Sequence, residues 1–99
     1  MAVKIQRGSG NVFTDLGFPP EEAANLQVRS DLMIQLRKRL EALKVTQRHA
    51  ARVLGVSQPR VSDLMRGRID RFSVDMLIKL LGKAGVEVRL TVRAKSRAA

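Results

Sequence analysis

The chain has 99 residues and a formal net charge of +10, from 19 Lys and Arg against nine Asp and Glu. Because domains typically hold roughly 50 to 200 residues, this length predicts one small domain and excludes a large enzyme. Hydrophobic residues make up 44% of the chain, which predicts a folded protein rather than a disordered one. The strong positive charge favours a polyanionic partner.

The residue types that carry most catalytic and metal chemistry are scarce. Cysteine is absent and His49 is the single histidine, which excludes disulfides, thiolate metal sites, zinc fingers and a cysteine nucleophile. His49 has no cysteine, second histidine or clear Ser–Asp set to work with, so we assign it no catalytic role. We expect no enzyme activity, no cofactor and no metal.

Neither a secretory signal nor a membrane span is indicated. The first 30 residues hold no apolar run of signal-peptide length, and no stretch approaches the ~18 apolar residues of a membrane helix. We therefore expect a soluble cytoplasmic protein, with no membrane partner. Three Phe and no Trp or Tyr are too few for stacking on unpaired bases, which favours duplex DNA as the polyanion.

The first part of the chain predicts an irregular arm followed by a long helical segment. Residues 1–19 are rich in Gly and Pro and have no sustained period, although Phe13, Leu16 and Phe18 are placed to pin part of the arm to the core. From Pro20 to about Lys44 a heptad repeat makes one helical stripe, formed by Leu26, Met33, Leu36, Leu40 and Leu43. A coiled dimer seam is the alternative to a core stripe. Arg29 interrupts the apolar stripe, which indicates either a kink or a junction between two shorter helices.

Residues 46–66 predict two short helices joined by a tight turn. Thr46 can cap the first helix and Gly55 can end it. Ser57 can cap the second, but Pro59 disfavours helical torsions at Gln58, so Gln58 is an alternative cap. The expected inward positions are Ala50, Ala51, Leu54, Val56, Val61, Leu64 and Met65. Gly67 has the position of a helix stop.

The last part predicts a helix and then a strand. Ser73 can cap a helix over residues 74–84, which Gly85 ends. The period then changes to two, with inward positions Val86, Val88, Leu90 and Val92. A lone strand needs a partner, either its own domain or, as we favour, the same strand of a second copy in a dimer. Residues 94–99 predict a frayed basic tail. The expected fold is all-α, a five-helix domain over residues 20–93 with one C-terminal β-strand.

The segment TQRHAARVLGVSQPRVSDLMRG resembles the helix-turn-helix of the Cro/phage-repressor family, also called XRE-type regulators. The flanking segments GNVFTDLGFPPEEA and VEVRLTVR resemble the HigA-type antitoxin branch of that family. The resemblance implies a compact helical DNA-binding fold that binds a twofold-related operator as a homodimer. For the antitoxin branch it also implies a partner toxin that cleaves messenger RNA.

By matching position, the resemblance assigns base contacts to Gln58, Pro59 and Asp63. Glutamine can pair with adenine, aspartate can accept from cytosine, and proline can contact a thymine methyl. Pro59 departs from the polar residue common in the family. The residues assigned to DNA phosphates are Gln47, Ser57, Arg60, Arg66 and Arg68. Around them, residues 46–72 carry six Arg and two Asp, a net charge of +4.

The resulting hypothesis is sequence-specific binding of double-stranded DNA by a transcriptional repressor, which autoregulates a toxin-antitoxin operon as its antitoxin. The arm and the outer face of the first helix are the surfaces left for a toxin. Two alternatives stay open: a stand-alone transcriptional regulator without a toxin, and a nucleoid-associated protein that binds DNA without sequence preference. Without a DNA-binding role, residues 46–66 would be an ordinary helical hairpin. The arginine cluster would then be an ordinary solvated surface.

Overall fold

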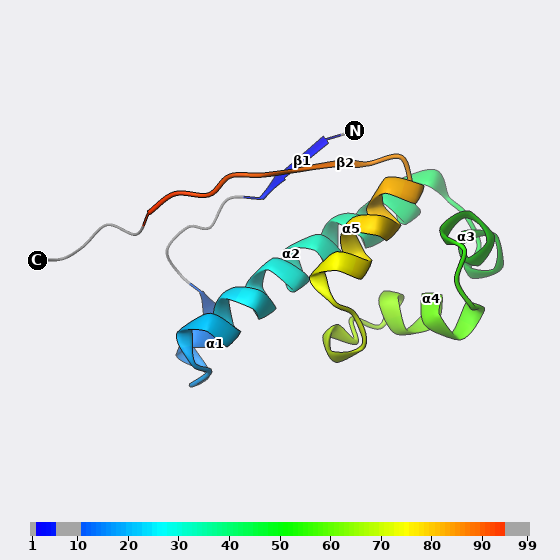
Figure 1. Ribbon diagram of the computed structural model, residues 1–99. Helices are drawn as coiled ribbons and strands as arrows, with labels where there is room; N and C mark the ends of the chain where they lie inside the picture. Colours follow the sequence, from blue (N-terminus) through cyan, green and yellow to red (C-terminus); the bar gives the residue numbers. More distant parts are fainter. Residues whose placement is uncertain (1, 6–10, 95–99) are drawn as a thin grey trace, which may run out of the picture.

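The structure is a computed structural model that describes residues 2–5 and 11–94. In chain order its elements are β1 (Ala2–Ile5), α1 (Val12–Asp15), α2 (Pro20–Leu43), α3 (Gln47–Leu54), α4 (Gln58–Met65), the 3-10 turn η1 (Ile69–Arg71), α5 (Val74–Lys83) and β2 (Glu87–Leu90). Five α-helices and a C-terminal strand confirm the predicted fold class. Figure 1 shows α2 as the central rod, with α5 beside it, α3 and α4 at one end, and α1 at the other. No helix among the described residues is both long and apolar enough to span a membrane.

The long helix α2 begins at Pro20 as predicted and runs without a break through Arg29. The expected kink or junction at Arg29 is therefore wrong. Arg29 leaves the apolar pattern without ending the helix, because its half-buried guanidinium finds backbone and side-chain acceptors. The helix ends at Lys44, which has a left-handed φ of 54°.

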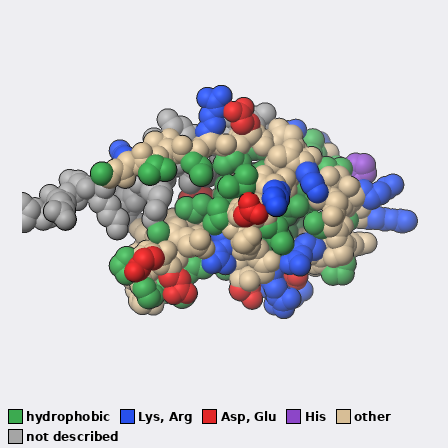
Figure 2. Space-filling model, viewed as in Figure 1, with side chains coloured by type: hydrophobic (Ala, Val, Ile, Leu, Met, Phe, Trp, Pro, Cys, Tyr) green, Lys and Arg blue, Asp and Glu red, His purple; other side chains and the backbone are tan. Residues whose placement is uncertain are grey.

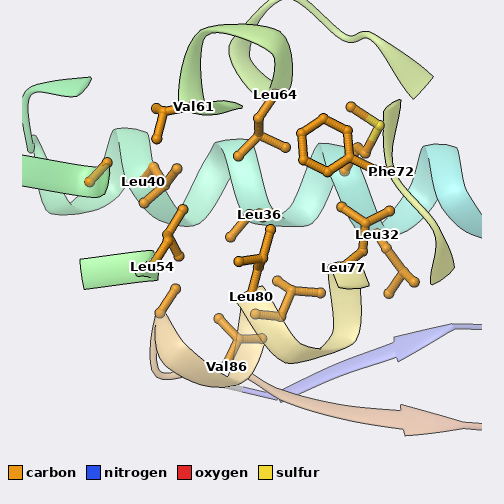
Figure 3. Packing of buried hydrophobic residues seen from close by; sticks show 14 of the residues in the cluster. Leu32, Leu36, Leu40, Leu54, Val61, Leu64, Phe72, Leu77, Leu80 and Val86 are labelled. Carbon is orange, nitrogen blue, oxygen red and sulfur yellow. The ribbon is translucent and has the colours of Figure 1, made fainter. Parts of the chain in front are cut away.

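The predicted stripe on α2 is buried in the middle and less covered at its ends. Leu36 is completely buried, whereas Leu26 is half-buried and Leu43 is 40% exposed. The reason is that α5 and the α3–α4 pair cover the middle of α2 (Figure 3). The main core lies between these elements and includes Leu32, Met33, Leu36, Leu40, Leu54, Val61, Leu64, Phe72, Leu77, Leu80, Leu81 and Val86.

Within the predicted irregular arm over residues 1–19, the described residues 2–5 and 11–19 contain a strand and a short helix. Asn11 caps the four-residue helix α1 by accepting from the N–H of Phe13 at 2.8 Å, and its side-chain amide donates to the carbonyl of Ala23 at 2.9 Å. The rings of Phe13 and Phe18 meet edge to face, with centroids 6.2 Å apart. Leu16 does not pin the arm, because it is 69% exposed.

The C-terminal strand finds its partner within the same chain, which was the alternative to the favoured pairing with a second copy. β2 pairs in parallel with β1, in a register that joins Ala2 to Glu87 and Ile5 to Leu90. The four residues of β1 are too few to display a strand period, so they were included in the irregular arm. This two-stranded sheet lies on the side of α2 and α5 opposite α4 (Figures 1 and 3). The predicted frayed tail over 94–99 lies, after Ala94, outside the described residues.

The strand is also shorter than its predicted span. Val86 is buried in the core just before β2, and Val88 packs against the core from the strand itself. Leu90 is 56% exposed, and Val92 lies past the end of β2 at 87% exposed. The alternating apolar positions therefore divide into an inner pair that completes this domain and an outer pair that remains uncovered.

Candidate nucleic-acid interface

The turn between α3 and α4 is built from a cap, a glycine and a second cap. Thr46 Oγ1 accepts from the N–H of His49 at 3.1 Å and starts α3, as predicted. Gly55 ends α3 with a φ of 68°, and the N–H of Val56 then donates to the carbonyl of Ala51 at 3.0 Å. This left-handed position favours glycine because glycine has no Cβ. The chain leaves the turn extended at Ser57, ready to start the next helix.

Ser57, rather than Gln58, is the cap of α4. Its Oγ accepts from the N–H of Arg60 at 3.2 Å, and the helix begins at Gln58. Pro59 occupies the second helical position, where no intrahelical N–H is needed. Gln58 and Pro59 are therefore both exposed in the first turn of α4.

The inward faces of the two helices agree with the predicted pattern. Leu54, Val61 and Leu64 are each no more than 1% exposed. Ala50 and Ala51 are also buried, which lets α3 pack closely against its neighbours. Val56 and Met65 are partly buried at the rim of this cluster. Because the inward faces are fully used, the outer faces of α3 and α4 keep fixed positions relative to one another.

The structure places the predicted base-facing residues on one helix but not all in one turn. Gln58 and Pro59 share the exposed first turn of α4, whereas Asp63 lies farther along the helix and is half-buried. Gln47 is the exposed first residue of α3, and Ser57 is exposed at the cap of α4.

The three arginines assigned to phosphates differ in their surroundings. Arg66 and Arg68 are exposed on either side of Gly67, which ends α4 with a φ of 72°. Arg60 is half-buried, and its Nη1 donates to the carbonyl of Arg71 at 2.9 Å. Its guanidinium thus already has a hydrogen-bond partner in its own chain, while those of Arg66 and Arg68 have no such contact among the described residues.

Two further arginines near this surface were not among the predicted site residues. Arg71 is exposed at the end of η1 and lies close to Arg66 and Arg68 in the sequence. Arg29 donates from α2 to carbonyls of the same loop, 40 and 43 residues ahead. A cation inside a predicted apolar stripe was the available signal for Arg29, because a half-buried guanidinium needs acceptors.

Charge is distributed unevenly over the molecule. Figure 2 shows Lys and Arg side chains over the end that carries α3 and α4, and acidic side chains around the opposite end near α1. The sequence explains the contrast, since residues 11–28 contain three acidic and no basic residues while residues 46–72 have a net charge of +4. The basic end is the one where Gln47, Gln58 and Arg66 are exposed.

Comparison with known proteins gives this geometry a family. Residues 12–93 match a family described as "Helix-turn-helix domain". A solved structure described as an XRE family transcriptional regulator is similar to the chain, with a TM-score of 0.72 and 31% identity over 79% of this chain and 88% of that one. The chain belongs to the XRE helix-turn-helix family. The search of curated proteins gives no significant match.

Family membership confirms the predicted helix-turn-helix over residues 46–67 and the XRE resemblance. The fold is that of a DNA-binding transcriptional regulator, with α4 in the position of the recognition helix. In helix-turn-helix proteins the recognition helix enters the major groove and its first residues meet the base edges, while the preceding helix crosses the backbone. In this XRE protein those first residues are Gln58 and Pro59.

Proposed function

We propose that this XRE protein is a transcriptional repressor that occupies a specific duplex DNA operator. The observation that supports this most is the rigid presentation of Gln58 and Pro59 in the exposed first turn of a capped, well-packed α4. Gln58 pairs with an adenine edge, Pro59 contacts a thymine methyl, and Asp63 accepts from a cytosine amino group farther along the groove. No catalysis and no cofactor take part.

Phosphate contacts flank this helix on both sides. Gln47 at the start of α3 and Ser57 at the cap of α4 are both exposed, and we expect them to donate to the DNA backbone. Arg66 and Arg68 extend the positive surface after α4. Such contacts fix register and supply most of the salt-dependent affinity, but they carry no sequence information.

The repressor acts as a homodimer on a pseudo-palindromic operator. Two recognition helices then read half-sites about one helical turn apart, ~34 Å. β1 occupies one edge of β2, and pairing through the other edge would cover Leu90 and Val92, which are 56% and 87% exposed. Val86 and Val88 already serve their own core, so the interface uses the outer half of the predicted dimerisation set.

Selection from genomic DNA tests the repressor proposal. Fragments of the source organism's DNA are bound to the purified protein near physiological salt and the bound fraction is sequenced. We expect enrichment of one pseudo-palindrome that lies upstream of this protein's own gene. Binding without an enriched motif contradicts the proposal and supports a nucleoid-associated protein instead.

We further propose that the protein is the antitoxin of a toxin-antitoxin operon, with DNA binding serving autoregulation. The observation that favours this is the acidic end of the molecule. There α1 and the segment after it expose Val12, Leu16 and Phe18 at 52%, 69% and 38%, beside Asp15 and two glutamates. An apolar surface rimmed by carboxylates fits a basic partner such as an mRNA-cleaving toxin.

Co-expression with the product of the neighbouring small gene tests the antitoxin role. We expect the two proteins to purify as a complex that Leu16→Lys weakens, whereas Leu90→Lys on the C-terminal strand does not. Growth arrest by the neighbour alone, relieved by co-expression, is the matching functional result. A neighbour that neither binds nor arrests growth leaves the stand-alone regulator as the better description.

A further inference from the structure

The loop that follows α4, residues 66–72, receives hydrogen bonds from a helix far away in sequence. Nη1 of Arg29 on α2 donates to the carbonyl of Ile69 at 3.2 Å and to that of Phe72 at 3.4 Å. Nε of the same side chain donates to Oδ1 of Asn25 at 2.8 Å. Arg29 is half-buried, and its Nε and Nη1 donors are used within the protein itself.

A second arginine holds the same loop from the other side. Nη1 of Arg60 on α4 donates to the carbonyl of Arg71 at 2.9 Å. The Arg60 guanidinium also lies over the ring of Phe72, 5.6 Å from its centroid, a distance at which cation–π attraction operates. Phe72 is itself 2% exposed and belongs to the core, so the Arg60 guanidinium packs on a ring whose position is fixed by the core.

These arginine contacts add to backbone hydrogen bonds within the loop and back to α4, among them those from the N–H of Arg68 to the carbonyl of Asp63 (3.0 Å) and from that of Ile69 to the carbonyl of Gly67 (2.8 Å). The regular part of the loop is the single 3-10 turn η1, closed by bonds from the N–H of Arg71 to the carbonyl of Arg68 (3.0 Å) and from that of Phe72 to the carbonyl of Ile69 (3.4 Å). Hydrogen bonds from a charged donor are roughly twice as strong as neutral ones. Three loop carbonyls accept such bonds from arginines on α2 and α4.

The exposed side of the loop carries Arg66, Arg68 and Arg71. The side chain of Arg71 is 54% exposed, and its nearest carboxylate is that of Asp70 at 3.8 Å, a loose surface pair. Arg71 therefore has two parts with different roles: its carbonyl accepts from Arg60, and its charged side chain faces solvent.

We propose that Arg29 and Arg60 are positioning residues for the DNA interface. They fix the 66–72 loop so that Arg66, Arg68 and Arg71 meet the phosphate backbone together, without an ordering cost at the moment of binding. This assigns Arg71 to the phosphate-contacting set in place of Arg60. The inference rests on the proposed DNA-binding function. Arg29 separates a positioning role from direct contact with DNA, because the Arg29 guanidinium makes its hydrogen bonds within the protein.

Binding of a short random-sequence duplex at several salt concentrations tests the proposal. Each phosphate contact contributes roughly 0.9 to the slope of log K against log salt. We expect Arg71→Gln to lower the slope by about 0.9, and Arg29→Gln to lower it by about 1 to 3, as the loop arginines lose their common alignment. Arg29→Lys, which keeps the charge but not the fork, should fall between wild type and Arg29→Gln.

Hydrogen exchange of the free protein supplies a readout that does not involve DNA. In Arg29→Gln and Arg60→Gln we expect the amides of residues 69–72 to exchange about tenfold faster or more, while those of α5 stay protected. If Arg29→Gln unfolds the chain, Arg60→Gln and Arg29→Lys carry the same test. Arg89→Gln is the matched control, since it removes an arginine from β2, where the side chain pairs with Glu87 at 2.8 Å.

The outcomes separate the inference from the function on which it rests. If wild type binds the duplex and Arg29→Gln keeps the wild-type slope and loop exchange, the positioning role is wrong. If Arg60→Gln loses about 0.9 in slope with unchanged loop exchange, Arg60 is a phosphate contact and our reassignment to Arg71 is wrong. If wild type binds no duplex at any salt concentration, the DNA-binding proposal itself fails.

Discussion

The hydroxyl oxygen of Ser57 accepts a hydrogen bond from the N–H of Arg60 at 3.2 Å, and this contact sets the first residue of the recognition helix. Ser73 makes the matching contact to the N–H of Met76 at 3.1 Å and starts α5 on a different side of the core. The two caps have the same chemistry but serve helices with different tasks.

We expect Ser57→Ala and Ser73→Ala each to lower the free energy of unfolding by about 1 kcal/mol, because each leaves a helix-terminal N–H without its partner. Urea denaturation measures both. Only Ser57→Ala should also weaken operator binding, since it loosens the turn that presents Gln58 and removes a hydroxyl proposed to contact a phosphate. Equal losses of operator affinity in the two variants would mean that the effect is one of global stability.

Gln58→Ala should reduce discrimination at one base pair of the operator by roughly 1 to 3 kcal/mol and leave non-specific affinity nearly unchanged. The side chain is exposed in the first turn of α4, and its loss leaves the backbone contacts in place. Competition binding with operators altered one base pair at a time locates the position. A parallel fall of specific and non-specific affinity would show that Gln58 does not read a base.

Leu36→Ala should lower the free energy of unfolding by about 2–5 kcal/mol, because Leu36 is completely buried between α2 and its neighbours. Ile34→Ala on the same helix is the matched control. Ile34 is 42% exposed, so we expect a change within about 0.5 kcal/mol. Thermal or chemical denaturation measures both, and a large loss for Ile34→Ala would mean that a partner surface covers this residue in solution.

Two left-handed residues predict changes of opposite sign. Lys44 ends α2 with a φ of 54°, and Lys44→Gly should raise the free energy of unfolding by about 1 kcal/mol. Gly55 has a φ of 68°, and Gly55→Ala should lower it by about 1–2 kcal/mol. An added Cβ at Gly55 would also lie 3.1 Å from Nζ of Lys83, although that flexible end can move aside. Denaturation of the two variants side by side checks both signs.

Leu90→Lys should raise the dissociation constant of the proposed homodimer by about tenfold or more, because it places a charge where the outer edge of β2 meets its copy. Sedimentation equilibrium over a range of concentrations measures the effect. Leu16→Lys makes the same change on α1, where Leu16 is 69% exposed, and should leave dimerisation unchanged. A wild-type chain that stays monomeric at every concentration contradicts the dimer.

The sequence predicted most of the fold where the determining contacts are local. Thr46, Ser57 and Ser73 cap helices because each side chain reaches an N–H three residues ahead. Gly55 and Gly67 end helices because a positive φ is a property of a single residue. The remaining ambiguity, whether Ser57 or Gln58 caps α4, required the actual position of Pro59 in the first turn.

What the sequence could not predict depends on partners far along the chain. Arg29 was interpreted as an interruption of a helix because its acceptors, the carbonyls of Ile69 and Phe72, lie 40 and 43 residues away. Arg60 was assigned to DNA for its charge and position, without knowledge of the carbonyl of Arg71 or the ring of Phe72. The base and phosphate assignments as a whole remain predictions for the binding experiments.

The parallel sheet has a consequence for the order in which the chain folds. Ala2 pairs with Glu87 and Ile5 with Leu90, so each pair closes almost the entire chain into one loop. Loop-closure entropy opposes contacts between such distant residues until other interactions have shortened the path, whereas helices and their neighbours form early. During synthesis on the ribosome, β1 therefore waits until residues 87–90 have emerged, and the helical core forms before the two strands are joined.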